Sequence, residues 1–148
     1  MIVYFCCAGG PTSMFFANCA RRIFKNEDKI YVDNIRKAVK KYYNGELKNY
    51  DLIFAQGTGF SATREFFSEN HFKELVDMVC LLPQVTFNLP KFKEHLDPMN
   101  IQCRTLTVND CADVFKDIKK ARSVFKELSE KYDLEFKENL EELHISFG

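Results

Sequence analysis

The sequence has no long apolar run, no surplus of either charge and no cysteine pair at metal-binding spacing. Lys+Arg and Asp+Glu are both 21, so nothing indicates the basic face that nucleic-acid binding requires. No apolar stretch is long enough to span a bilayer, and no basic leader precedes the first apolar segment. We therefore expect a single cytoplasmic domain over residues 1–148 that neither binds nucleic acid nor inserts into a membrane.

Cysteine and histidine are present without the spacing of a metal site. None of the 6 cysteines belongs to a CxxC pair, and the 3 histidines are scattered along the chain. The sequence therefore predicts neither a metal site nor a cofactor. A chain of this size without a secretion signal folds without disulfides, so we expect reduced thiols.

Apolar runs of strand length alternate with helical patterns along the chain, which is typical of a three-layer α/β/α fold with a parallel sheet. The predicted strands are Ile2–Phe5, Lys29–Val32, Asp51–Ala55, Asp77–Leu82 and Gln102–Val108. The predicted helices are Ser13–Phe24, Ile35–Tyr43, Pro90–Leu96 and a long helix from Asp110 or Asp113 to about Tyr132, with shorter helical patterns at Ala62–Phe67 and Phe72–Val76. This indicates a sheet of four strands, or five if both central runs join it.

The strongest chemical signal is the first strand running through Cys6 and a glycine-rich segment into a helix. A helix N-terminus presents unpaired N–H groups and a partial positive charge, and glycines let backbone amides turn toward a phosphate. The same field favours a thiolate, so we expect Cys6 to be a nucleophile with a lowered pKa. The predicted phosphate-binding segment is Cys7, Ala8, Gly9, Gly10, Pro11, Thr12 and Ser13.

Within this segment, Cys6 is the better nucleophile candidate because it lies at the end of the strand, whereas the side chain of Cys7 points to another side. The hydroxyls of Thr12 and Ser13 either cap the helix or donate to a bound phosphate, or do both. The local residues leave one alternative open. In it, the segment is only a glycine-rich turn and Cys6 packs as a small buried apolar side chain.

Two segments resemble the lactose/cellobiose-type B component (enzyme IIB) of the bacterial sugar phosphotransferase system. The stretch from Tyr4 to Met14 is similar to that family's cysteine loop. The stretch from Asp77 to Val85, followed by Leu89-Pro90, is similar to its third strand and the Gly-Pro-Gln loop after it. The resemblance extends over most of residues 1–128, with an insertion expected at about 45–76 and an added tail at 133–148.

The resemblance implies a four-stranded parallel sheet of order 2-1-3-4 and a phosphoryl carrier. In such a carrier, Cys6 accepts a phosphoryl group from a histidine of the A component (IIA) and passes it to a sugar held by the membrane-embedded C component (IIC). Pro83 and Gln84 would form a second loop beside the cysteine. The chain would be cytoplasmic, would associate transiently with IIC, and would use no cofactor or metal.

Two residues depart from the family pattern. Pro11 stands where a serine with a backbone N–H is usual, which removes one potential phosphate donor. Leu82 stands where a glycine usually precedes Pro-Gln, which narrows the approach to the thiol. These departures keep open a regulatory or binding role without onward transfer.

A low-molecular-weight phosphatase-like hydrolase is the nearest chemical rival, because it shares this fold and a cysteine loop. That motif needs an arginine six residues after the cysteine, and here the position holds Thr12. Gly57-Thr58-Gly59 does not complete a nucleotide-binding glycine pattern and is interpreted as a turn. His71 and His95 lie in charged helical stretches and are interpreted as surface residues.

Overall fold

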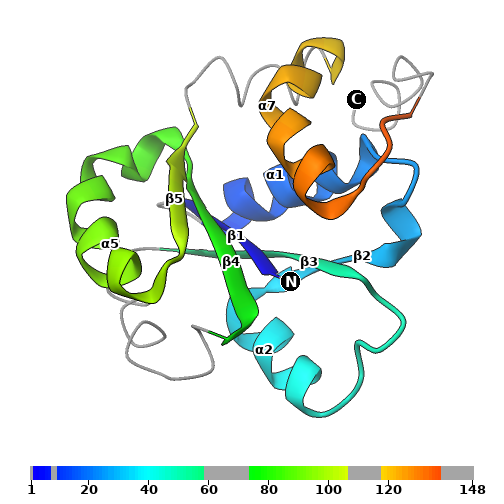
Figure 1. The fold of residues 1–148 in the computed structure, drawn as a ribbon, viewed down its shortest axis with the longest axis horizontal. Coiled ribbons are helices and arrows are strands. Elements are labelled where there is room, and N and C mark those ends of the chain that lie inside the picture. Colours follow the sequence, from blue (N-terminus) through cyan, green and yellow to red (C-terminus); the bar gives the residue numbers. More distant parts are fainter. Residues whose placement is uncertain (1, 8–9, 59–73, 107–117, 138–148) are drawn as a thin grey trace.

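The computed structural model describes residues 2–7, 10–58, 74–106 and 118–137 (Figure 1). Its strands are β1 (Ile2–Cys7), β2 (Ile30–Asn34), β3 (Leu52–Thr58), β4 (Val76–Leu81) and β5 (Gln102–Thr105). Its α-helices are α1 (Gly10–Arg22), α2 (Ile35–Tyr43), α5 (Leu89–Leu96) and α7 (Ile118–Tyr132). Short 3₁₀ turns, η1 (Glu27–Lys29), η2 (Pro83–Asn88) and η3 (Asp97–Met99), connect some of them.

The strands form one parallel sheet of order β2-β3-β1-β4-β5, which confirms the predicted α/β fold. The strand order differs from 2-1-3-4 in one respect, because β3 lies between β2 and β1. Residues 52–57 of β3 are all buried, whereas only Ile30 of β2 is buried, so β3 suits the interior and β2 the edge. If β2 is left aside and the other four strands are numbered 1 to 4 along the chain, the order β3-β1-β4-β5 becomes 2-1-3-4, which is the expected order.

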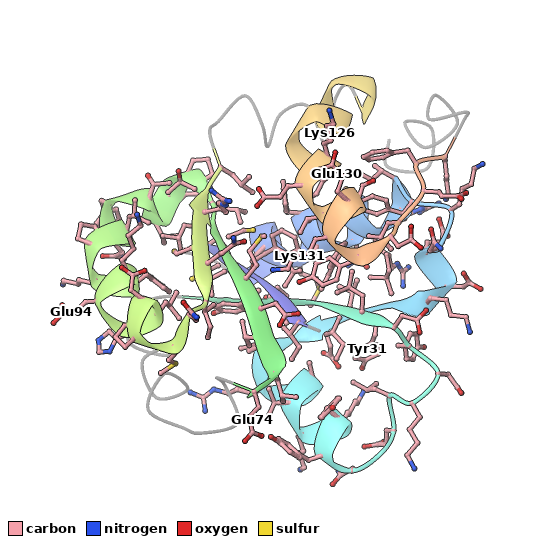
Figure 2. The ribbon with its side chains drawn as sticks, viewed as in Figure 1. Tyr31, Glu74, Glu94, Lys126, Glu130 and Lys131 are labelled. Carbon is pink, nitrogen blue, oxygen red and sulfur yellow. The ribbon has the colours of Figure 1, made fainter. Side chains whose placement is uncertain are left out.

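Helices cover both faces of the sheet (Figure 1). Helices α1 and α7 pack on one face, and α2 and α5 pack on the other, so each face has its own apolar core. Charged side chains such as Glu94 of α5 and Lys126 and Glu130 of α7 point away from the sheet (Figure 2). This is the three-layer arrangement that the alternating pattern predicts.

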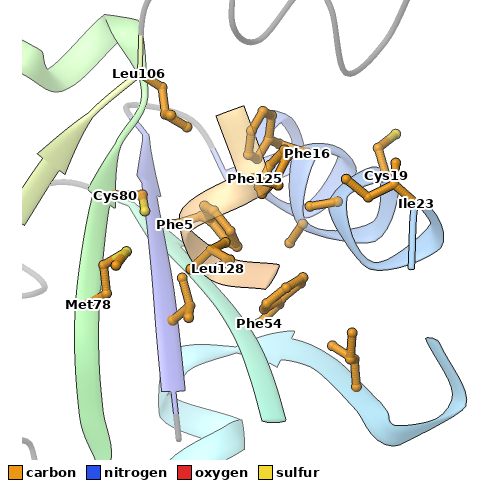
Figure 3. Packing of buried hydrophobic residues seen from close by; sticks show 14 of the residues in the cluster. Phe5, Phe16, Cys19, Ile23, Phe54, Met78, Cys80, Leu106, Phe125 and Leu128 are labelled. Atoms are coloured by element: carbon orange, nitrogen blue, oxygen red, sulfur yellow. The ribbon is translucent and has the colours of Figure 1, made fainter. Parts of the chain in front are cut away.

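Phenylalanine rings fill the core between the sheet and the α1/α7 layer (Figure 3). The ring of Phe5 on β1 lies 5.3 Å from that of Phe16 on α1 and 5.5 Å from that of Phe54 on β3, in edge-on geometry. Phe16 also contacts Phe125 of α7 at 5.9 Å. Edge-on aromatic pairs add to the stabilisation from burial, so these contacts hold α1 and α7 against the centre of the sheet.

Helix α2 has the predicted bounds, and both ends show why. At its start, the side chain of Asn34 accepts a hydrogen bond from the Arg36 N–H at 2.9 Å. At its end, the N–H groups of Gly45 and Glu46 donate to the carbonyls of Tyr42 and Lys41, with Gly45 at φ +75°. This is a Schellman ending, in which glycine adopts the left-handed conformation at little steric cost.

Other element boundaries differ from expectation or lie outside the described residues. Strand β1 continues two residues past Phe5, and α1 begins at Gly10 and ends at Arg22. Helix α7 ends at Tyr132 as predicted, while the expected start of that helix, the pattern at Ala62–Phe67 and residues 138–148 lie outside the described residues. Among the described helices, none has the length and apolar character needed to cross a membrane.

The segment after α7 returns to the connection between α1 and β2. The Lys25 N–H donates to the Glu135 carbonyl at 2.7 Å, and the Lys137 N–H donates to the Ile23 carbonyl at 3.0 Å. The rings of Phe24 and Phe136 stack at 5.2 Å. The beginning of the expected added tail therefore packs on the domain and extends the α1/α7 core.

Gly57 should not tolerate a larger side chain. A Cβ atom there would lie 2.4 Å from the Tyr4 hydroxyl oxygen and 2.9 Å from its ring, inside a packed sheet. We expect Gly57→Ala to lower the free energy of unfolding by about 1–3 kcal/mol, measured by urea denaturation. Tyr4→Phe removes the nearest atom, so the double variant should cost less than the sum of the two single variants. Simple additivity would contradict this explanation.

Candidate functional site

The carboxyl ends of the three central strands meet at one edge of the sheet. Cys6 of β1 pairs with Gly57 of β3 on one side and with Leu81 of β4 on the other. The chain leaves β1 toward α1 on one face and leaves β4 toward α5 on the opposite face. In parallel α/β sheets, ligands bind where neighbouring strands send their connections to opposite faces, and here that point is the end of β1.

Cys6 and Cys7 are the last two residues of β1, and both are fully buried. Because side chains alternate along a strand, Cys6 packs in the core beneath α2 and α5, whereas Cys7 packs in the core beneath α1 and α7. The sequence predicted that the strand ends before Cys6. It is longer because both neighbouring strands pair with β1 up to this level, and the Leu82 N–H donates to the Cys6 carbonyl at 2.9 Å.

The predicted phosphate-binding segment connects β1 to α1. Gly10, Pro11 and Thr12 lie in the first turn of α1, whereas Ala8 and Gly9 lie outside the described residues. The position of Pro11 explains why proline is tolerated, since first-turn N–H groups have no partner within the helix. In a helix, the first turn is where N–H groups lack intrahelical acceptors and the dipole is positive, which suits an anion.

Ser13 lies in the same turn, but its hydroxyl is directed at the sheet. The Ser13 Oγ donates to the Oε1 of Gln56 on β3 at 3.1 Å, and both side chains are buried. This bond ties the start of α1 to the strand beside β1. Gln56 was not singled out from the sequence, although a glutamine at the end of the apolar run Asp51–Ala55 was a usable signal.

The second predicted loop follows β4 and is linked to Cys6 through Leu82. Leu82 has φ −70° and ψ 162°, an ordinary extended conformation, so glycine is not required there. Pro83 begins η2 and Gln84 is exposed in it. The turn is fixed by the Val85 N–H donating to the Leu82 carbonyl and by the Thr86 hydroxyl donating to the Pro83 carbonyl.

The described cysteines are all free thiols, and three of them have raised pKa values. Burial raises the pKa of Cys80 to about 12 and the pKa values of Cys19 and Cys103 to about 11. These three therefore stay protonated near neutral pH and are poor nucleophiles.

Three other residues singled out from the sequence, Gly57, Thr58 and His95, lie within the described part of the chain. Gly57 and Thr58, interpreted from the sequence as part of a turn, are the last residues of β3, and Gly59 lies outside the described residues. His95 is half-buried on α5, and His71 also lies outside them. Across the part of the chain that the structure describes, no group of three His, Cys, Asp or Glu side chains could hold a metal ion.

Comparisons with known proteins give one structural likeness. No protein-family model matches the sequence, and no curated protein matches it. Among solved structures, the fold is similar to that of the lactose-specific IIB component domain of the phosphoenolpyruvate:carbohydrate phosphotransferase system from Streptococcus pneumoniae. The TM-score is 0.50 at 19% identity, over 86% of this chain and 95% of that one. The chain therefore has the fold of that domain, as the resemblance of its motifs predicts.

The Ser13–Gln56 hydrogen bond should stabilise the start of α1 measurably. Gln56→Leu removes the acceptor that Gln56 provides to the buried Ser13 hydroxyl, so we expect a loss of about 1–3 kcal/mol in the free energy of unfolding. Ser13→Ala should cost a similar amount, and the double variant should cost less than the sum of the two single changes because both break the same hydrogen bond. Urea denaturation of the four proteins measures the coupling. A coupling energy near zero would show that the bond does not hold the helix.

Proposed function

We propose that this chain is the phosphoryl carrier of a sugar phosphotransferase system, with Cys6 as the residue that carries the phosphoryl group. The observation that supports this most strongly is the placement of Cys6. It lies at the end of the central strand, directly before the N-terminal turn of α1, in a chain with the fold of a IIB domain. Among the described thiols, this edge position is shared only with Cys7, which packs in the core beneath α1 and α7, so the two cysteines are tested side by side below.

The proposed chemistry consists of two in-line displacements at phosphorus. The Cys6 thiolate attacks a phosphohistidine of a IIA component, an S–P bond forms, and the P–N bond breaks with its electron pair returning to the histidine. A hydroxyl of the sugar bound by IIC then attacks the phosphocysteine. The O–P bond forms, the thiolate leaves, and the hydroxyl proton passes to a base of the acceptor complex. Backbone N–H groups of the α1 turn stabilise the three equatorial oxygens.

Two features of the segment around Cys6 affect how well it can bind and transfer a phosphoryl group. Pro11 contributes no N–H, so the cradle depends on the remaining amides between Cys7 and Ser13. Cys6 is fully buried, so its sulfur must become accessible when a donor binds. The Leu82 N–H bond to the Cys6 carbonyl joins the two loops, so movement of the β4 loop is one way to expose the thiol.

A regulatory relative that binds a partner without passing phosphate on is the second candidate, and the burial of Cys6 favours it. A phosphatase-like hydrolase is less well supported, because Thr12 occupies the position of the arginine that would grip a phosphate dianion. In the carrier role the partners are a IIA component and a membrane IIC component. The protein would then work in the cytoplasm and associate transiently with the membrane through IIC.

Transfer of radiolabelled phosphate from a phosphorylated lactose-type IIA component tests the proposal directly. We expect wild-type protein to take up label on Cys6, and Cys6→Ser to take up less than about a hundredth as much, because the better nucleophile and leaving group is lost. Cys7→Ser is the matched control, since it alters the neighbouring buried thiol and should keep most of the uptake. Circular dichroism confirms that each variant is folded.

Each alternative gives a different result in this assay. Absence of label on the wild-type protein would contradict the carrier role and favour the regulatory one. Uptake followed by rapid release of inorganic phosphate without a sugar acceptor would indicate a hydrolase. Loss of uptake in Cys7→Ser but not in Cys6→Ser would show that Cys7, and not Cys6, carries the phosphoryl group.

A further inference from the structure

A concave site lies at the amino edge of the sheet, away from Cys6. Helix α2 starts beside the carboxyl end of β2 and runs back, so its last turn lies near the residues that precede β3. A cavity of about 660 Å³ opens there, within the size range of small-molecule sites. Its lining residues are Tyr42, Tyr43, Asn44, Gly45, Leu47, Lys48 and Tyr50.

Aromatic rings form much of the wall of this cavity. The rings of Tyr42 and Tyr43 are nearly perpendicular, with centroids 5.6 Å apart. The ring of Tyr31 packs against that of Tyr50, with the ring centroids 5.1 Å apart. The Tyr31 hydroxyl donates to the Asp33 carboxylate and accepts from the Lys41 ammonium group. Figure 2 shows Tyr31 beside this part of the chain. The wall that Tyr50 presents is therefore supported by a polar network.

Three polar groups at the cavity, on Tyr42, Lys48 and Tyr50, are available to a ligand. Within the described part of the chain, the hydroxyls of Tyr42 and Tyr50 make no hydrogen bond, and Lys48 makes no ion pair. The Lys48 side chain lies over Gly45, since a Cβ atom at Gly45 would be 3.4 Å from its Cε and 3.8 Å from its Nζ. The glycine turn that ends α2 thus places an ammonium group at the mouth of a tyrosine-walled cavity.

Basic side chains outnumber acidic ones on the two segments that form the cavity, and Lys40 and Lys41 offset the negative end of the α2 dipole. Helix α2 contains Arg36, Lys37, Lys40 and Lys41 and no acidic residue. Lys37 and Lys40 are exposed, and neither forms an ion pair with any residue that the structure describes. The carboxylates nearest to the lining in sequence are those of Glu46, which accepts a bond from the Asn44 amide at 3.4 Å, and Asp51, and neither is part of the lining. A third, Glu74, acts on Tyr43, since burial and then the Glu74 charge raise the pKa of the Tyr43 hydroxyl.

We infer that this cavity binds a small organic phosphate that carries a polyhydroxylated ring, the chemistry of a sugar phosphate. The tyrosine rings would pack on the ring of the ligand, the hydroxyls of Tyr42 and Tyr50 would bond to its hydroxyls, and Lys48 would bind the phosphate. The site is separate from Cys6 and its chemistry. The inference can therefore stand or fall independently of the proposed carrier function.

Amide chemical shifts from nuclear magnetic resonance locate the binding site during titration of the full-length protein. The probes are glucose 6-phosphate, glucose and inorganic phosphate. With glucose 6-phosphate we expect saturable shifts at Asn44, Gly45 and Lys48, and binding at least about tenfold tighter than with either half of the ligand. Lys48→Met should weaken binding by about tenfold, because one charge-assisted bond is lost.

Lys126→Met is the matched control, since Lys126 is an exposed lysine on α7, across the sheet from α2 (Figure 2). It should bind as wild type does, and Tyr43→Ser, at a half-exposed ring, should weaken binding. The inference is wrong if no saturable shift occurs or if Lys126→Met weakens binding as much as Lys48→Met. It is also wrong if the shifts cluster at residues 9–13, which would place the anion at the cysteine loop. That last result would leave the proposed carrier function untouched.

Discussion

The pairing of β1 with β3 on one side and β4 on the other is the constraint on which the rest of the structure depends. A strand buried on both faces and bonded on both edges sends alternate side chains into two separate cores. Ile2, Tyr4 and Cys6 enter one core, and Val3, Phe5 and Cys7 enter the other. Two adjacent cysteines thus acquire different surroundings, as the alternation of side chains along a strand leads one to expect.

The position of α1 follows from the same strand. Phe5 contacts Phe16 and Phe54, and the Ser13 hydroxyl reaches Gln56 one strand away, so apolar and polar contacts fix the same end of the helix. The first turn of α1 is where its unpaired amides lie. The packing that stabilises the fold therefore also sets the place and direction of the group best suited to bind an anion near Cys6.

The two edges of a parallel sheet differ chemically because every crossover runs in the same sense. At the carboxyl edge, the strands end and α1 begins, and this edge holds Cys6, Cys7 and the N-terminal turn of α1. At the amino edge, α2 ends, and its carbonyls are capped by the Gly45 turn, which also brings Lys48 toward Tyr42 and Tyr50. The polarity of the fold separates the candidate thiol chemistry from the tyrosine-walled cavity.

Local patterns in the sequence were sufficient for features that depend on neighbouring residues. The bounds of α2, the end of α7 at Tyr132 and the segments of all five strands follow from capping residues and apolar periodicity. The resemblance of two short motifs predicted the fold that the solved IIB domain shares, although no family model matches. These features need only information carried within a few residues.

Features that depend on contacts between distant segments were decided by the tertiary structure alone. The apolar run at 51–55 was evident in the sequence. Its position between β2 and β1 was not, because the composition of an apolar run does not reveal which strands it pairs with. The length of β1 depended on pairing partners that lie about 50 and 75 residues away. The bond from Ser13 to Gln56 and the burial of Cys6 are likewise long-range. The sequence by itself therefore determined the elements and the candidate nucleophile. Packing decided the neighbours of that nucleophile and how deeply it is buried.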